Sequence, residues 1–418
     1  MGRLSVLGLI CGAVLAAASC GGMSGTGTNP PTGGSNPDMA TAYLTPIPPP
    51  APQIWAGAGR IIAAPHVVPI FFKNDLLQTA LMAFLQSYMS SSASWQVLSD
   101  YGVGRGTVGS AVVLNITPPA TMTDTDITNL IISSVQTGSL PAADASTIYL
   151  FYFPTSTTIT RGTDASCREF EGYHNVVTFP DSSKAAYSVV PRCGRTQVAL
   201  LTIATSHELA ESATDPVIVS YNEMTDPYDL WGFNLNGSEV GDLCENLSDA
   251  AVSESGIGIV SRLWSNSAAA AFKNPCLPAP ANSDIFAVPV LSSLRPVQIN
   301  GRLHSVEVVQ IQAGHTRSID VHLLSSVSPS PTWTVTALEV PLPASSGAGG
   351  TPSLTFAWQE ATLMSQVTGK NGDVFHLEIT VPATTPAGLT TFRLTSTLPL
   401  GSGGQTQTMW VGAVEITK

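Results

Sequence analysis

Three side chains near the middle of the chain have the types and the spacing needed for metal chemistry. His207 and Glu211 are four residues apart in the stretch Ser206-His207-Glu208-Leu209-Ala210-Glu211. In a helix, this spacing places them one turn apart on the same face. Imidazole and carboxylate are both zinc ligands. Glu208 would remain free to accept a proton as a general base.

This stretch has the layout of the H-E-x-x-H zinc helix, with a carboxylate in place of the second histidine. Short motifs also match by chance, and a capped helix end that carries a few charges is the alternative. We expect a mostly buried helix over residues 196–214, because the apolar run 198–204 leads directly into His207. Asp215-Pro216 ends it, since proline pushes the preceding residue out of the helical region. Burying one imidazole and two carboxylates is costly unless they are paired or bind a metal.

The distribution of charge supports a bound cation. Between Thr196 and Ser261 the sequence has no Lys or Arg. The same stretch contains eleven carboxylates, namely Glu208, Glu211, Asp215, Glu223, Asp226, Asp229, Glu239, Asp242, Glu245, Asp249 and Glu254. Carboxylates that converge without a basic side chain require a cation or full solvation. For Glu223, Asp226 and Asp229 we expect a solvated loop, because no regular calcium-binding loop is present.

Two other segments carry candidates for a third metal ligand. Glu239 and Asp242 lie in the stretch Glu239-Val240-Gly241-Asp242-Leu243-Cys244, which a disulfide at Cys244 would fix. His174 lies in a cysteine-bracketed loop, where an exposed position is at least as compatible with the sequence. A third ligand that is anionic would neutralise Zn²⁺ fully and weaken its Lewis acidity, so such a site could bind metal and still catalyse poorly.

The N-terminus and the overall charge indicate an exported protein that does not bind nucleic acid. Residues 1–19 form an export signal, whose apolar part is short for a membrane span. The segment Leu15-Ala16-Ala17-Ala18-Ser19-Cys20 resembles a bacterial lipobox, which would lipidate Cys20 and anchor the chain to a membrane. Ordinary signal cleavage is the alternative. The net charge of −12 offers no basic patch for phosphates. We expect a cell-envelope lipoprotein or an extracellular protein.

Export also places the remaining cysteines in an oxidising compartment, where an even number predicts disulfides. They are Cys167, Cys193, Cys244 and Cys276. Three pairings are open. We expect Cys167–Cys193 with Cys244–Cys276, because this pairing closes the shortest loops. A thiolate metal site is disfavoured, since the sequence has no C-x-x-C spacing here.

The chain is too long for one compact domain. Residues 20–53 are rich in Gly, Ser and Pro and predict a flexible tether. Residues 54–278 alternate strand and helix patterns, which is typical of an α/β (α+β) domain. Its clearest strands are 66–72 and the nearly continuous apolar run 147–153, which is expected in a sheet covered on both faces.

A Pro-rich linker at 277–280 precedes a change of pattern. In residues 284–418 apolar positions recur with period two, as in Ile319, Val321 and Leu323. Short alternating strands with Gly, Pro and Ser turns predict an antiparallel all-β sandwich. The segment 382–388 resembles the linker of bacterial immunoglobulin-like modules. We expect no catalytic role for this domain.

Several motifs of residues 60–278 occur in a fixed order. They are Cys167, Gly172-Tyr173-His174, Thr178-Phe179-Pro180, Cys193, His207-Glu208-Leu209-Ala210-Glu211, Asp215-Pro216, Gly241-Asp242-Leu243-Cys244, Leu263-Trp264-Ser265-Asn266 and Cys276. In this order they resemble the EXORDIUM-like, or phosphate-induced, secreted family, over about half the chain. The resemblance implies a shared zincin-like fold and a shared metal-like site. Plant members have additional cysteines near Cys167 and no comparable lipobox or C-terminal domain, so their growth-signalling role is not carried over.

Two functions follow as hypotheses. The first is an exported, lipid-anchored zinc metallopeptidase-like hydrolase acting on a protein or peptide. His207 and Glu211 would be ligands, Asp242, Glu239 or His174 would complete the site, and Glu208 would be the base. The second is a non-catalytic cell-surface or extracellular binding protein with a structural or vestigial metal site. Its interaction surfaces would be the acidic segment 215–255 and the sandwich.

Overall fold

The structure is a computed structural model of the 418-residue chain. It describes residues 53–56, 60–194, 198–216, 231–233, 239–299, 302–340, 354–361, 365–401 and 403–418. The export signal, Cys20 and almost all of the tether lie outside these ranges, as do Glu223, Asp226 and Asp229. Within the described ranges, none of the helices has both the length and the apolar character needed to span a membrane.

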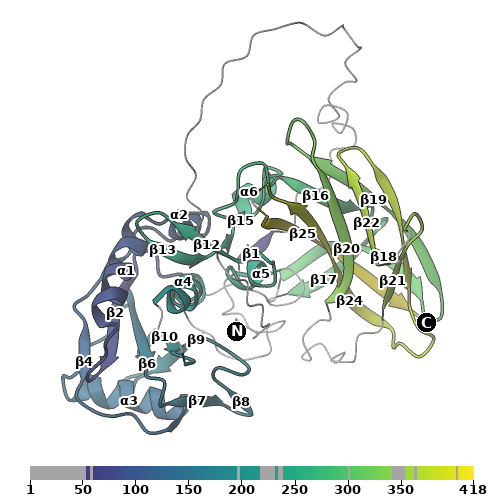
Figure 1. Ribbon diagram of the computed structural model, residues 1–418. Helices are drawn as coiled ribbons and strands as arrows, with labels where there is room; N and C mark the ends of the chain where they lie inside the picture. Colours follow the sequence, from purple (N-terminus) through teal and green to yellow (C-terminus); the bar gives the residue numbers. More distant parts are fainter. Residues whose placement is uncertain are drawn as a thin grey trace, which may run out of the picture.

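A six-stranded sheet forms the centre of the first region (Figure 1). Its strand order is β3-β2-β6-β10-β9, with β4 paired to β2. The strands are β2 (His66–Phe72), β3 (Thr107–Val108), β4 (Val112–Leu114), β6 (Thr147–Phe153), β9 (Tyr173–Thr178) and β10 (Lys184–Pro191). All neighbours run parallel except β9, which is antiparallel to β10 at the edge. The predicted α/β region is therefore confirmed, and the structure adds that its sheet is mostly parallel.

Helices cover both faces of this sheet. They are α1 (Gln78–Ser91), α3 (Asp124–Gln136) and α4 (Val198–Thr214). Alternate side chains of β6 enter two separate apolar clusters, Ile148 and Leu150 with α1 and α4, and Tyr149 and Phe151 with α3. Every residue of β6 is buried for this reason, as its continuous apolar sequence predicted. Helix α3 begins with a capping box between Thr123 and its third residue, which fixes where it starts.

Helix α4 is buried along most of its length, although most residues of its C-terminal half, 206–214, are polar. Its hydroxyl groups find partners nearby. The Thr205 and Tyr152 hydroxyls lie 3.1 Å apart, and the Ser212 and Ser188 hydroxyls lie 2.8 Å apart. The helix ends at Thr214, directly before Asp215-Pro216 as predicted, and its described part begins at Val198. Apart from the hydroxyl groups, the polar side chains in the C-terminal half of α4 are the imidazole of His207 and the carboxylates of Glu208 and Glu211.

The other elements of the first region are short. They are β1 (Ile54–Ala56), α2 (Ala93–Gln96), a 3₁₀ helix (Val97–Tyr101), β5 (Thr121–Thr123), β7 (Thr158–Arg161), β8 (Asp164–Ala165), β11 (Trp231–Phe233), α5 (Asp242–Glu245), β12 (Ala251–Glu254), β13 (Gly258–Ser261), β14 (Leu263–Trp264), α6 (Asn266–Ala270) and β15 (Cys276–Leu277). Both expected disulfides form, Cys167–Cys193 and Cys244–Cys276. The second joins α5 to β15 and therefore holds Asp242 against the body of the domain.

The second region consists of two β-sheets. One has the order β16-β19-β23-β21 and the other β17-β18-β25-β24-β20-β22. The strands are β16 (Ile285–Pro289), β17 (Ser293–Ile299), β18 (Arg302–Gln312), β19 (Thr316–Ser325), β20 (Thr332–Val340), β21 (Thr355–Trp358), β22 (Gln366–Lys370), β23 (Val374–Thr380), β24 (Gly388–Pro399) and β25 (Gln405–Thr417). All pairs are antiparallel, as predicted, except β18 with β25, which run parallel.

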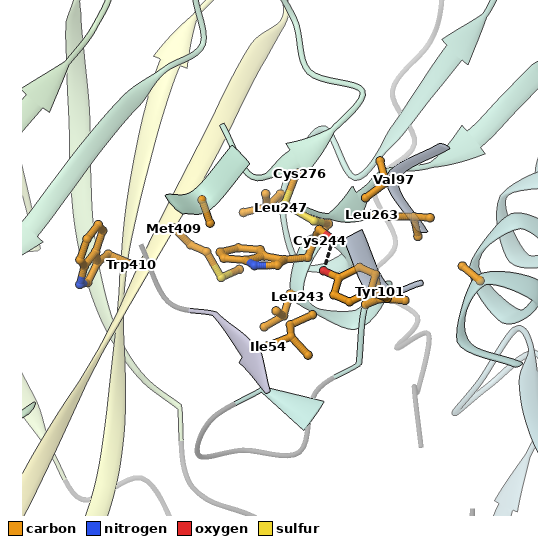
Figure 2. Close-up of a cluster of buried hydrophobic side chains, with 14 of the residues drawn as sticks. Ile54, Val97, Tyr101, Leu243, Cys244, Leu247, Leu263, Cys276, Met409 and Trp410 are labelled. Atoms are coloured by element: carbon orange, nitrogen blue, oxygen red, sulfur yellow. Dashed lines mark hydrogen bonds between the residues drawn. A yellow bond between two sulfur atoms is a disulfide. The ribbon is translucent and has the colours of Figure 1, made fainter. Parts of the chain in front are cut away.

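The two regions share one apolar core rather than meeting only at a linker. Figure 2 shows Met409 and Trp410 of β25 in the same cluster as Leu247 and the disulfide Cys244–Cys276. Asp249 adds polar contacts across this junction, because its carboxylate accepts hydrogen bonds from the Thr406 hydroxyl at 2.7 Å and from the Gln407 backbone at 3.3 Å. The segment 242–249, which begins with Asp242, is thus in contact with the second region.

Candidate metal centre

The six predicted site residues come together beside the last two turns of α4. His207, Glu208 and Glu211 lie on α4 and are completely buried. Glu239 and Asp242 lie just before and at the start of α5, and both are buried. His174 lies on the edge strand β9 with only 1% of its surface exposed, so the exposed loop position left open for it is wrong. Its strand faces α4, which brings the imidazole to the motif.

One group of ligands gathers around His207. Its Nε2 atom lies 3.1 Å from Oε1 of Glu211 and 3.5 Å from Oδ1 of Asp242. The same Glu211 oxygen accepts hydrogen bonds from the backbone amides of Gly241 at 3.1 Å and Asp242 at 3.3 Å. One ligand atom from each of these three side chains lies within 4.8 Å of the others, so the group could hold a metal ion.

A second group gathers around His174. Its Nδ1 atom lies 3.6 Å from Oε2 of Glu208 and 3.6 Å from Oε2 of Glu211. Its Nε2 atom lies 3.7 Å from Oε1 of Glu239. These separations exceed hydrogen-bond distance. His174 with Glu208 and Glu211 could hold an ion, and so could His174 with Asp215 and Glu239.

Several polar atoms of this site are buried without a hydrogen bond to any described residue. They include both ring nitrogens of His174 and His207, both oxygens of Glu208, and Oε2 of Glu211. Each such atom costs about 1–3 kcal/mol, and more when charged. Imidazole nitrogens and carboxylate oxygens that converge in this way are the donors that zinc and other divalent first-row metals prefer. A bound cation would therefore coordinate the nitrogen and oxygen atoms that have no hydrogen-bond partner among the described residues.

The pKa shifts of the metal-free cluster also favour a bound cation. Burial raises the pKa of Glu211 to about 8, with Asp242 and Glu239 adding to the effect and His207 opposing it. Burial lowers the pKa of His207, but Glu211, Asp242 and Glu208 outweigh it and hold that pKa well above its usual value. The metal-free cluster therefore keeps protons at neutral pH that a divalent cation would displace.

Two glycines let the backbone pass directly against the site. A Cβ atom at Gly241 would lie 2.6 Å from Nδ1 of His207 and 2.8 Å from Oε1 of Glu211. A Cβ atom at Gly172 would lie 2.7 Å from Oε1 of Glu208. Glycine precedes Asp242 in one motif, and it stands two residues before His174 in the other, because only glycine leaves room for the ligands of α4.

Gly241→Ala is therefore expected to weaken zinc binding about 10-fold or more, in the range seen for changes that displace ligands. The added methyl must push away either His207 or Glu211, which are packed against α4. Titration calorimetry with Zn²⁺ measures the effect. Gly388→Ala is the matched control, because nothing lies within 4 Å of a Cβ atom there. Equal zinc affinities in the two variants would contradict this account of Gly241.

Two further carboxylates interact with the site residues and were not predicted as site residues. Asp215 follows Glu211 by one helical turn and could share an ion with His174 and Glu239. Asp215 belongs to the acidic stretch and ends the helix, and its four-residue spacing from Glu211 was the sequence signal for a ligand position. Burial, and then Asp242, raise the pKa of Glu245 to about 9. Its spacing of three residues from Asp242 on α5 was the corresponding signal.

Other members of the acidic stretch have structural roles instead. Glu254 accepts hydrogen bonds from the backbone amides of Ala93 and Ser94, at the start of α2. Asp249 pairs with the buried Arg262. Carboxylates at a helix start and beside a guanidinium are stabilised without any metal. The described carboxylates of the acidic stretch are thus divided between a buried cluster and ordinary structural contacts.

Comparisons with known proteins assign no family. No family model matches the sequence, and no curated protein matches it. The S-layer protein SbsC domains 4 and 5 match 31% of this chain and 54% of theirs at 12% identity, with a TM-score of 0.18. The cohesin module of a Clostridium perfringens ATCC13124 family 33 glycoside hydrolase matches 32% of this chain and 98% of its own at 12% identity, with a TM-score of 0.17. Murine CRIg matches 30% and 98% at 10% identity, with a TM-score of 0.18.

These TM-scores are too low for the likenesses to carry an argument. The chain spans about half of the S-layer fragment that it matches. The physical observations are more informative. The two disulfides indicate an extracellular or cell-surface protein. The buried cluster of histidines and carboxylates could hold a metal ion.

Proposed function

We propose that this chain is an exported, metal-dependent hydrolase of the metallopeptidase type. The observation that carries the proposal is the buried group His207, Glu211 and Asp242 beside Glu208, whose two carboxylate oxygens have no described hydrogen-bond partner. A structural carboxylate would be expected to accept hydrogen bonds in such a buried place. A carboxylate left bare beside a metal-binding group is instead suited to receive a proton.

The residues of the site would have the following roles. His207 Nε2, Glu211 Oε1 and Asp242 Oδ1 would hold zinc. Zinc, when bound, polarises a carbonyl group and makes a water molecule more acidic. Glu208 is next to His207 in the sequence and would take the water's proton as general base. The backbone amides of Gly241 and Asp242 orient Glu211 by donating to its Oε1 atom.

The fold around the site supports a zincin-like domain and the EXORDIUM-like relationship. The ligand helix α4 packs against β10 of a parallel sheet, whose edge strand β9 is antiparallel. The motifs with Gly172, His207 and Gly241, far apart in the sequence, meet at one place in the structure. Convergence of the pieces that carry the resemblance is what a shared site requires.

The rest of the proposal concerns location and substrate. The substrate would be a protein or peptide outside the cytoplasm, as expected for this class of site and for a disulfide-bonded chain. Lipid on Cys20 would hold the enzyme at the cell envelope. The second region is proposed to be an immunoglobulin-like module that supports the first, because its described part consists of β-strands and none of the described groups that could hold a metal ion includes one of its residues.

Glu208→Gln tests the catalytic assignment. We expect the rate of peptide hydrolysis to fall about 10²- to 10⁴-fold, the usual contribution of a general base. Zinc at His207 should remain, because this substitution leaves its three ligands intact. Hydrolysis of a fluorogenic peptide library, with metal content measured on the same samples, reads out both effects. Glu307→Gln is the control, because Glu307 is exposed on β18.

A non-catalytic binding protein is the second candidate, favoured by the charge of the first ligand group. Two carboxylates and one imidazole neutralise Zn²⁺, which weakens its Lewis acidity. Stoichiometric metal lost in His207→Ala, together with no hydrolysis by the wild type across the peptide library, would favour this candidate. A well-folded wild-type protein that binds no metal would rule out the hydrolase.

A further inference from the structure

The two oxygens of Glu211 face two different histidines. Oε1 lies 3.1 Å from Nε2 of His207, and Oε2 lies 3.6 Å from Nδ1 of His174. Both imidazoles are buried, and neither ring has a hydrogen-bond partner among the described residues. A single carboxylate that reaches two separate sets of ligands is the arrangement that bridges a pair of metal ions.

The ring of His174 is already oriented for an ion on its Nδ1 side. Oε2 atoms of Glu208 and Glu211 lie at the same distance, 3.6 Å, from Nδ1. The opposite nitrogen, Nε2, faces Glu239 at 3.7 Å. In metal sites, the ring nitrogen that does not bind the ion commonly faces a carboxylate, which fixes the tautomer and the ring orientation. Glu239 occupies that position here.

One ion leaves part of this site unexplained. A divalent ion held by His207, Glu211 and Asp242 is neutralised by the two carboxylates among its ligands. Glu208 and His174 would then remain buried, with both carboxylate oxygens and both ring nitrogens bare. An unsatisfied carboxylate in such surroundings is strongly unfavourable. A second cation between Glu208 and His174 removes this cost.

We propose that the centre binds two divalent metal ions bridged by Glu211. The first ion is bound by His207 Nε2, Glu211 Oε1 and Asp242 Oδ1, and the second by His174 Nδ1, Glu211 Oε2 and Glu208 Oε2. Donor sets of one imidazole with carboxylates suit Zn²⁺, Mn²⁺ or Fe²⁺. This inference rests on the proposed function and deepens it, because Glu208 then binds an ion through one oxygen and keeps the other for the proton.

Metal stoichiometry and magnetic coupling test the proposal on the purified protein. After chelation and dialysis, native mass spectrometry with added Zn²⁺ should show two ions per chain. His174→Ala and His207→Ala should each retain one ion, and His376→Ala, which removes an exposed histidine of β23, should retain two. With Mn²⁺, the electron paramagnetic resonance spectrum should show exchange coupling, since bridged ions lie roughly 3.5–4 Å apart.

The wild-type measurements test the two-ion centre even if a variant fails to fold. One ion at saturation would overturn the two-ion centre and leave the proposed hydrolase intact. No bound ion would overturn both proposals. Two ions without exchange coupling would contradict the Glu211 bridge. A folded His174→Ala variant that still binds two ions would likewise overturn the assignment of the second position.

Discussion

The metal-free protein is expected to lose stability as the pH rises from about 5 to 8, and zinc should abolish most of this loss. The cause is the proton that Glu211 retains in the folded state. Burial raises the pKa of this carboxyl from its usual 4.5 to about 8, so between these values the folded chain binds a proton that the unfolded chain has released. By linkage, the free energy of unfolding falls with rising pH in that window, by up to about 1.4 kcal/mol per pH unit.

The two histidines add to this trend. The carboxylates around His207 and His174 outweigh burial and raise the pKa of both imidazoles in the folded state. Stability from such a group is fully present below its unfolded pKa and is lost as the pH rises through the folded value. All three groups therefore act in the same direction above pH 6.5. Metal binding replaces these protons, so zinc should stabilise the protein more strongly at pH 8 than at pH 5.

Urea unfolding of the chelator-treated protein at several pH values measures this effect directly. The midpoint should move to lower urea concentration as the pH rises, and zinc should restore it at pH 8. Glu211→Gln is the matched control, because a neutral amide cannot titrate and the slope should flatten. A metal-free wild-type protein that is equally stable at pH 5 and pH 8 would contradict the proton-sharing cluster.

Removal of the buried disulfide is expected to produce the second large effect. Cys244→Ala with Cys276→Ala should destabilise the protein by more than about 3–4 kcal/mol, the chain-entropy value for a loop of this size. Both cysteines are fully buried in the core that joins the two regions (Figure 2), so the substitution also leaves a cavity. Asp242 lies two residues before Cys244, and zinc affinity should fall with the loss of this constraint.

The other disulfide provides an internal comparison. Cys167 and Cys193 are separated by 26 residues and Cys244 and Cys276 by 32, so the two loop entropies are nearly equal. Cys167 is exposed and Cys193 is half-buried, so Cys167→Ala with Cys193→Ala leaves almost no cavity. The free energies of unfolding from urea curves should therefore fall further for the buried pair. Equal losses would show that burial of the second disulfide contributes nothing.

Much of the first region follows from local sequence patterns. The run 147–153 predicted a strand covered on both faces, because every position after Thr147 is aliphatic or aromatic. Thr123 determined the start of α3 through its capping box, and Asp215-Pro216 determined the end of α4. These features depend on a few neighbouring residues, and their physical causes act over one or two helical turns. The pairing of the cysteines followed from loop length.

The metal centre followed from the sequence only in part. The four-residue spacing of His207 and Glu211 is a property of any helix, so the sequence alone placed them on one face. The position of His174 depends on the antiparallel pairing of β9 with β10, which sets which side chains face α4. The position of Glu211 between His207 and His174 depends on segments thirty or more residues away in either direction, which meet only after the sheet and helix have packed. Helical periodicity thus determined which side chains form the first pair, and tertiary packing decided that a second histidine completes the centre.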